Sequence, residues 1–202
     1  MLFLPAGRSL VTTLSQQRNN IDMGKYDSND SELEPPIKLD YIMENFIERI
    51  ENVKALFNQN LSAVIDIATS SNDYNRESEA RVRLAKQLID SILKGSYRYH
   101  NGTERIEFSD GQSTLINFAS SGQQEVVWIL LLILLLILNQ RKVFLVIEEP
   151  EAHLFPVAQK QIIDLIALVA TQNDNQVVLT THSPYIPLIF QQSSLRLQLG
   201  KR

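Results

Sequence analysis

The chain has 202 residues, 44% of them hydrophobic, with no cysteine and a formal net charge of −4 at pH 7. This length predicts one domain, or one domain with an inserted subdomain, and the apolar fraction is sufficient for a hydrophobic core. The lack of cysteine excludes disulfides and thiolate metal sites and fits a reducing cytosol. The acidic balance does not indicate a nucleic-acid scaffold, and it leaves a local basic patch open as an alternative.

The first part of the chain predicts a short strand followed by a long polar loop. Leu2–Leu4 is apolar, and Pro5 ends it because proline cannot continue the pairing of a strand. The segment 16–36 is polar and rich in turn-forming residues, so it predicts a mobile loop.

Two helices are expected next. Apolar residues at spacings of three and four predict one helix over Leu39–Phe57 and another over Glu77–Lys94, which Gly95 ends. We expect these helices to form an insertion that packs on itself. The chain would then divide into a core, residues 1–10 and 95–202, and a segment 11–94 that contains the loop and the helical insertion.

After Gly95 the apolar pattern changes to a period of two. The segments Ser96–His100, Thr103–Ser109 and Ser113–Phe118 therefore predict three short strands. Asn101-Gly102 and Asp110-Gly111 lie between them, and both dipeptides favour tight hairpin turns. The sequence predicts a small antiparallel meander.

A run of 13 apolar residues, Val126–Leu138, predicts a helix buried on nearly all sides. A membrane-spanning helix needs about 20 such residues, so we expect no membrane segment here. The residues that begin this helix are Ser120, Ser121, Gly122 and Gln123. They resemble a capping box, and free N–H groups at a helix start also favour an anion such as a phosphate. Capping alone explains the serines, but it explains the glycine less well.

Two carboxylates, Glu148 and Glu149, directly follow the apolar run Val143–Ile147, which predicts a fully buried strand. Ligands of open α/β sheets bind at the carboxyl ends of the strands. One carboxylate there can hold Mg²⁺ while the other activates an attacking water. The alternative is a strand end that simply turns into solvent.

A βαβ unit is predicted after this point. A helix over about Val157–Thr171 leads to a second buried strand, Gln176–Thr181, and then to His182. The right-handed crossover makes the two strands parallel and brings their carboxyl ends together. We therefore expect His182 near the two carboxylates, where it could bond a phosphate oxygen or the attacking water.

Three segments in this order, SSGQQE, VFLVIEEPEAHLFP and VVLTTHSP, resemble the C-terminal half of an ABC-type ATPase. The resemblance is greatest to the RecF/SMC-like branch, and within it to the OLD-family (overcoming lysogenisation defect) AAA-type ATPases. The segment FLPAGRS, from Phe3 to Ser9, resembles a strand and turn of that family. The resemblance implies an α/β fold: a partial P-loop NTPase core with parallel strands, a small antiparallel meander and a helical insertion.

The resemblance also implies residue roles. Ser120–Gln123 would belong to the signature motif, which contacts the γ-phosphate of ATP held by the other protomer. Glu148 would be the Walker B acid that orders Mg²⁺, and Glu149 would be the catalytic base. Glu151–His153 would form the D-loop at the dimer interface, and His182 would be the switch histidine.

One motif of the family is missing from this sequence. A P-loop reads G-x-x-x-x-G-K-[ST], but Gly24-Lys25 is followed by Tyr26, and Gly200-Lys201 also does not fit. In the family the motif precedes the FLPAGRS segment, so we expect that this chain is truncated and begins after it. The alternatives are a second chain that supplies the P-loop, or a naturally degenerate ATPase.

The expected function of the parent protein is Mg²⁺-dependent ATP hydrolysis in a head-to-tail dimer, in a cytoplasmic DNA-repair or phage-defence system. Its partners would be ATP, a second copy, and DNA or an effector nuclease, with no membrane. This chain alone is expected to be inactive. The alternative function is a non-catalytic interaction module that lacks the P-loop.

Overall fold

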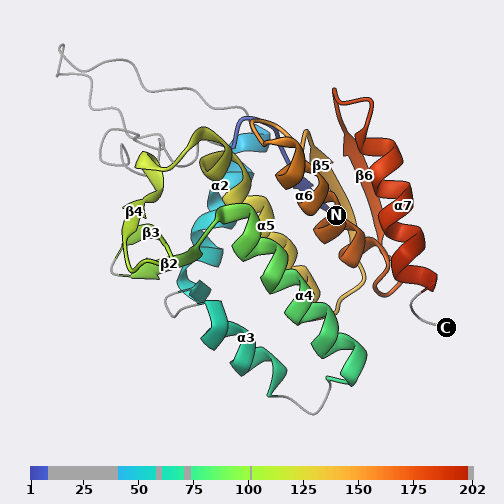
Figure 1. The fold of residues 1–202 in the computed structure, drawn as a ribbon, viewed down its shortest axis with the longest axis horizontal. Helices are drawn as coiled ribbons and strands as arrows, with labels where there is room; N and C mark the ends of the chain where they lie inside the picture. Colours follow the sequence, from blue (N-terminus) through green and yellow to red (C-terminus); the bar gives the residue numbers. More distant parts are fainter. Residues whose placement is uncertain (9–40, 58–60, 71–73, 101, 200–202) are drawn as a thin grey trace.

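The computed structural model describes residues 1–8, 41–57, 61–70, 74–100 and 102–199. The predicted loop 16–36 lies outside these residues. Within them the chain forms a parallel sheet, an antiparallel sheet and a set of helices (Figure 1). The α/β fold predicted from the sequence is confirmed.

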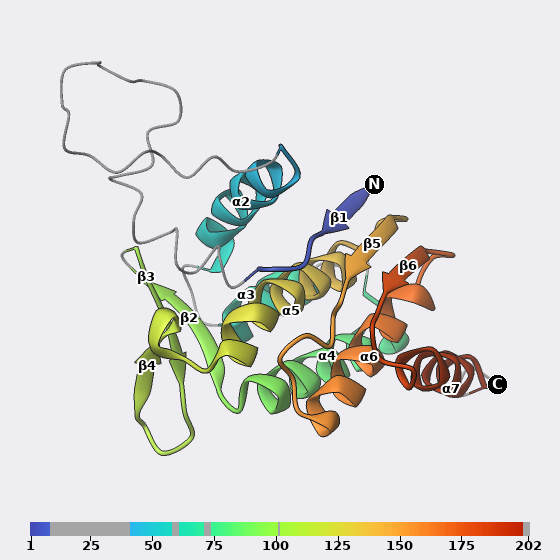
Figure 2. The same ribbon diagram turned by 90° about the horizontal axis from the view of Figure 1, so that it is seen from above.

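The parallel sheet has the strand order β1-β5-β6. Its strands are β1 (Leu2–Leu4), β5 (Phe144–Glu148) and β6 (Gln176–Thr180). Leu2 pairs with Leu145, and Phe144 pairs with Gln176, so the central strand is β5. Figure 2 shows the three strands side by side, with β6 at one edge. The last residues of β5 and β6 are consequently neighbours at one end of the sheet.

The strands β5 and β6 are less buried than the sequence predicts. Leu145 and Ile147 are fully buried, but Phe144 is 39% exposed and Val178 on β6 is 45% exposed. The predictions of a fully buried strand at β5 and of a second buried strand at β6 are therefore wrong. Continuous apolar runs are typical of strands covered on both faces, whereas alternating burial shows that one face of this sheet is covered less than the other.

Three helices pack together and form most of the core: α4 (Arg76–Leu93), α5 (Ser121–Asn139) and α6 (Pro156–Ala170). They run side by side in Figure 1. A fourth helix, α7 (Ile186–Leu199), packs on α6. The expectation that the second insertion helix packs on the first is wrong, because α4 packs on α5 and α6 instead.

Helix α5 is the apolar helix of the sequence. Among the described residues it is the one helix long and apolar enough to cross a membrane, but 72% of its most apolar window is buried inside the protein. Its central residues, from Val126 to Leu134, are all buried. The prediction of a buried core helix is confirmed.

The antiparallel sheet contains β2 (Ser96–His100), β3 (Thr103–Glu107) and β4 (Ser113–Leu115) in that order. The last predicted strand is shorter than expected, because the 3-10 helix η3 (Ile116–Phe118) replaces its second half. The meander itself is confirmed.

Helix α2 (Tyr41–Lys54) leads into the 3-10 helix η2 (Ala55–Phe57), which contacts strand β2. The next helix, α3 (Leu61–Thr69), contacts both β2 and α5. A buried ionic cluster joins the end of α2 to strand β3. The ammonium of Lys54 is 2.7 Å from Glu104 Oε2 and 2.9 Å from Glu51 Oε1, and it lies 5.1 Å from the centre of the Trp128 ring. Glu104 also accepts a hydrogen bond from Tyr97 Oη at 2.9 Å.

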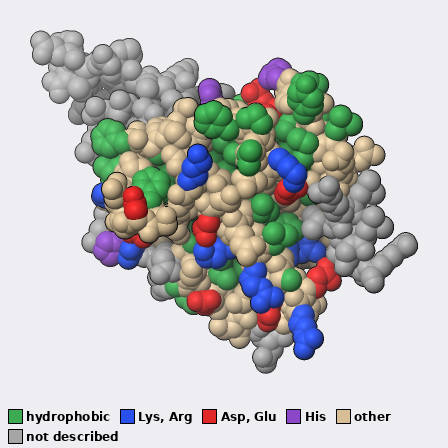
Figure 3. Space-filling view, viewed as in Figure 1, with side chains coloured by type: hydrophobic (Ala, Val, Ile, Leu, Met, Phe, Trp, Pro, Cys, Tyr) green, Lys and Arg blue, Asp and Glu red, His purple; other side chains and the backbone are tan. Residues whose placement is uncertain are grey.

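Several charged residues of α4 and α6 pair along their own helix. Arg81 pairs with Glu77, Lys86 with Asp90, and Lys160 with Asp164, each four residues away. Figure 3 accordingly shows basic and acidic side chains interspersed on this face. Pairs at this spacing stabilise a solvated helix surface.

Candidate functional site

The two predicted carboxylates lie at the C-terminal end of β5. Glu148 is the last residue of the strand and pairs with Thr180. Glu149 follows in the left-handed region with φ of 42°, and its N–H donates to Thr180 O at 3.0 Å. A non-glycine residue in this conformation is costly and persists only where its surroundings hold it.

His182 is brought to the same place by β6. Its Nε2 lies 3.0 Å from Glu149 Oε1, with side-chain exposures of 89% for His182 and 36% for Glu149. Both groups are therefore open to an incoming ligand. Glu148 is half-buried, and its Oε2 accepts a hydrogen bond from the Ala6 N–H at 3.1 Å. The structure thus brings the three predicted residues of this edge together.

Arg8, which the sequence analysis did not single out, lies directly behind these carboxylates. Its side chain is fully buried. One guanidinium nitrogen donates to Glu148 O at 2.8 Å and to Pro5 O, and another donates to Glu149 O at 3.1 Å. Arg8 therefore holds the peptide groups of both carboxylate residues.

Glu125 of helix α5 is the ionic partner of Arg8. Glu125 Oε1 lies 3.3 Å from Arg8 Nη2 and accepts the Arg8 backbone N–H at 2.9 Å. Burial lowers the pKa of the Arg8 guanidinium, and the charges of Glu125, Glu149 and Glu148 oppose that shift by raising the pKa. The negative charges of these carboxylates thus help to keep the buried guanidinium protonated.

The start of α5 is capped as the sequence predicts. The hydroxyl of Ser120 accepts from the Gln123 N–H at 3.4 Å, and Gln123 Oε1 accepts from the Ser120 N–H at 3.0 Å. Gln123 Nε2 also donates to Leu93 O at 2.7 Å, which ties α4 to this turn. Ser121 is exposed.

Gly122 has a packing role that the sequence did not show. A Cβ at this position would lie 2.6 Å from the carbonyl oxygen of His153. The segment Glu151–His153 therefore lies directly against the first turn of α5. Glu151 is buried and accepts a hydrogen bond from Thr181 Oγ1, so this segment also contacts the end of the β6 region.

The donor set at the end of β5 fits a single hydrated Mg²⁺. Among the described residues no group of three or more His, Asp or Glu side chains is arranged to hold a metal ion. A nucleotide-bound Mg²⁺ does not need such a group, because one or two carboxylates, water and phosphate oxygens complete its shell. Glu148, at the end of β5, is the residue predicted for that role.

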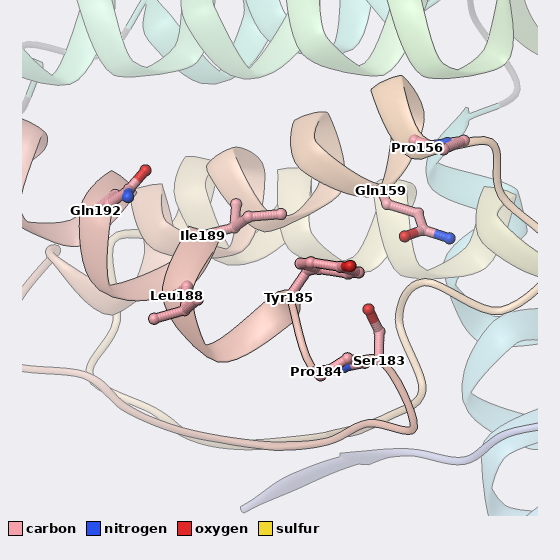
Figure 4. Close-up of a pocket in the computed structure, with 8 residues that line it drawn as sticks. All are labelled: Pro156, Gln159, Ser183, Pro184, Tyr185, Leu188, Ile189 and Gln192. Atoms are coloured by element: carbon pink, nitrogen blue, oxygen red, sulfur yellow. The ribbon is translucent and has the colours of Figure 1, made fainter.

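An apolar pocket lies beside the site, between the start of α6 and α7 (Figure 4). Tyr185, Leu188 and Ile189 line it, and Ser183 stands at its edge next to His182. Glu148 and Glu149 do not line this pocket, so the pocket is separate from the candidate catalytic site.

Comparison with known proteins assigns this chain to a protein family. The sequence model of the AAA ATPase domain matches residues 3–186. The chain belongs to this ATPase family. No curated protein matches. Among solved structures the SMC head domain from Thermotoga maritima is similar, with a TM-score of 0.38 and 18% identity; the match covers 66% of this chain and 44% of that one.

The match thus confirms membership of an ATPase family, which the sequence resemblance predicted. The finer assignments remain predictions: the OLD-like branch, the C-terminal position within a longer core, the division into core and insertion, and the roles of the site residues.

Proposed function

We propose that this chain is the catalytic and interface part of an ABC-type ATPase of the RecF/SMC-like branch, most similar to the OLD family. It would hydrolyse ATP with Mg²⁺ in a head-to-tail dimer. The observation that carries the proposal is the 3.0 Å contact between His182 and Glu149 at the ends of two adjacent parallel strands, in a chain of an ATPase family.

In this proposal Glu149 is the general base. It is partly exposed, so its carboxylate can accept the proton of a water molecule that approaches from solvent. Its left-handed backbone is held from two sides, by Thr180 O and by Arg8. The backbone that carries the carboxylate is therefore held before a ligand arrives, which favours positioned catalysis.

His182 and Glu148 complete the proposed half-site. The imidazole of His182 is largely exposed. With a proton on both ring nitrogens it can donate to a phosphate oxygen while Nε2 stays in contact with Glu149. Glu148 would hold Mg²⁺, which when bound neutralises charge on the phosphate oxygens. The neighbouring N–H of Ala6 keeps the Glu148 carboxylate at the strand end.

The residues Ser120–Gln123 would act on the nucleotide of the other protomer. The capping box occupies the N–H groups of Ser120 and Gln123, and the positive end of the helix dipole at this turn favours a phosphate. The loop Glu151–His153 packs against this turn, so one surface would carry both elements of a dimer interface. A cytoplasmic role in DNA repair or phage defence, with DNA or an effector nuclease as partner, belongs to the same proposal.

Dimerisation tests this proposal. The assay needs a protein in which a P-loop accompanies these residues, in the same chain or in a second one, because the motif is absent from this sequence. With Mg²⁺ and ATP, Glu149→Gln should accumulate as a dimer in light scattering, since hydrolysis no longer separates the protomers.

The matched control is Glu107→Gln, which changes an exposed carboxylate on β3 that pairs with Arg98. This control should behave like the wild type. If ATP produces no dimer of Glu149→Gln, the head-to-tail ATPase is wrong, and a non-catalytic interaction module becomes the better description.

A further inference from the structure

We propose that Arg8 is a positioning residue for the candidate base Glu149, and that Glu125 holds Arg8 in place for this task. The inference rests on the proposed role of Glu149. It adds a residue from the first turn after β1 and a residue from α5 to the site, although neither of them faces a ligand.

The guanidinium of Arg8 donates four hydrogen bonds to backbone oxygens and forms one ion pair. The Nε group donates to Glu125 O at 3.1 Å, and Nη1 donates to the carbonyl oxygens of Pro5 and Glu148. Nη2 donates to Glu149 O and pairs with the Glu125 carboxylate. A guanidinium has five N–H donors in one plane, and five acceptors surround it here.

This arrangement needs arginine and not merely a positive charge. Lysine has three donors on one nitrogen, so it cannot reach at the same time the acceptors that lie around the edge of a planar guanidinium. A lysine at position 8 would keep the charge next to Glu125 but release at least some of the carbonyl groups. The carbonyl of Glu149 belongs to the residue with the left-handed backbone, so its release would let the carboxylate turn.

Glu125 supplies the link to helix α5. It lies in the same first part of α5 as the capping box, and both its carboxylate and its backbone oxygen contact Arg8. One buried ion pair therefore connects the candidate phosphate-binding turn to the candidate base. A shift of the helix start would be transmitted to Glu149 through rigid, fully buried groups.

The tautomer of the His182 imidazole depends on the position of the Glu149 carboxylate, so it can be used to measure that position in the absence of nucleotide. In the neutral ring, the Glu149 carboxylate 3.0 Å from Nε2 favours the tautomer with the proton on Nε2. Nitrogen-15 NMR at one fixed pH measures the tautomer fraction, and the chain has only three histidines to assign. Glu149→Ala gives the value expected when the acceptor is gone.

We expect Arg8→Lys to move the tautomer fraction of His182 more than half of the way to the Glu149→Ala value. The control is Arg81→Lys, because Arg81 is also largely buried and also donates to a backbone carbonyl, that of Leu168, at 2.6 Å. A purely structural loss of a buried guanidinium would affect both variants alike. Arg81→Lys should retain the wild-type tautomer fraction.

If Arg8→Lys does not fold, Glu125→Gln provides the same test, since it keeps the shape of the partner and removes its charge. It should shift His182 in the same direction by a smaller amount. The inference is overturned if the folded variant at position 8, or in its absence Glu125→Gln, leaves the His182 signal at the wild-type value.

Hydrolysis separates this inference from the proposed function. In a protein with a P-loop, Arg8→Lys should lower kcat by about 10²-fold, the usual effect of a misplaced catalytic group, and leave KM nearly unchanged. A loss in Glu149→Gln but not in Arg8→Lys would refute the positioning role alone. Full activity of Glu149→Gln would refute the proposed function itself.

Discussion

The contact between Gly122 and the carbonyl oxygen of His153 makes a sharp prediction for Gly122→Ala. The added Cβ would lie 2.6 Å from that oxygen, whereas ordinary contact begins at 3.4 Å. The first turn of α5 and the Glu151–His153 segment must therefore separate by about 0.8 Å. Because the opposing atom belongs to the backbone, no side-chain rotation relieves the clash.

The size of the effect follows from two opposing terms. Overpacking of this kind destabilises a protein by about 1–3 kcal/mol. Alanine is a better helix former than glycine by about 0.8–1.0 kcal/mol in a helix interior, and the gain is smaller in a first turn. We expect a net loss of about 1–2 kcal/mol. For a chain of this length the loss lowers Tm by about 2–8 °C.

Thermal unfolding followed by circular dichroism measures this change. Ser121→Ala is the matched control, because Ser121 is the adjacent, exposed residue of the same turn, and its effect should stay within about 0.5 kcal/mol. Faster amide exchange of Leu154, whose N–H donates to Glu151 O at 3.1 Å, should accompany the loss in Gly122→Ala. If Gly122→Ala is as stable as the wild type, the glycine is not required for packing, and its use for a close phosphate approach gains support.

Three further predictions concern the core and the nucleotide. Lys54→Met should lower the free energy of unfolding in urea by about 3–5 kcal/mol, because it leaves buried Glu104 without its ion pair; adding Glu104→Gln should restore part of the loss. Burial and the nearby Glu104 raise the pKa of Tyr97 well above 10.0. The folded state therefore holds this proton more tightly than the unfolded chain, so the stability from Tyr97 is complete below pH 10 and is lost as the pH rises toward the folded pKa. Tyr97→Phe should remove this part of the alkaline slope, and an unchanged slope in urea unfolding would contradict the assignment. Finally, calorimetry should show that this chain alone binds ATP with a Kd above about 100 μM, since the phosphate contacts of a P-loop are missing from its sequence; low-micromolar binding would refute that view.

The parts of the fold that were predictable are those fixed by local pattern. The strand β5, the capped helix α5 and the antiparallel pairing of β2, β3 and β4 follow from apolar runs, a capping box and Asn-Gly or Asp-Gly dipeptides in the sequence. The contact of His182 with Glu149 was predictable because a right-handed βαβ unit leaves few alternatives for the strand ends.

Other features depend on contacts that no local pattern records. The apolar face of α4, with Val82, Ala85 and Ile89, has the same periodicity whether it meets α2 or the α5–α6 pair. Arg8 is a single arginine after a turn, and its acceptors Glu125, Glu148 and Glu149 lie 117 to 141 residues further along the chain. Only the fold shows that this arginine is buried behind the site.

The most direct test of the account is the rate of phosphate release from Mg²⁺-ATP by Glu149→Gln, in a protein that includes a P-loop. Removing a positioned general base should slow hydrolysis by about 10²–10⁴-fold, while Glu107→Gln, the exposed control on β3, keeps the parent rate. If Glu149→Gln also hydrolyses ATP at the parent rate, Glu149 is not the base, and the end of β5 is not the catalytic site.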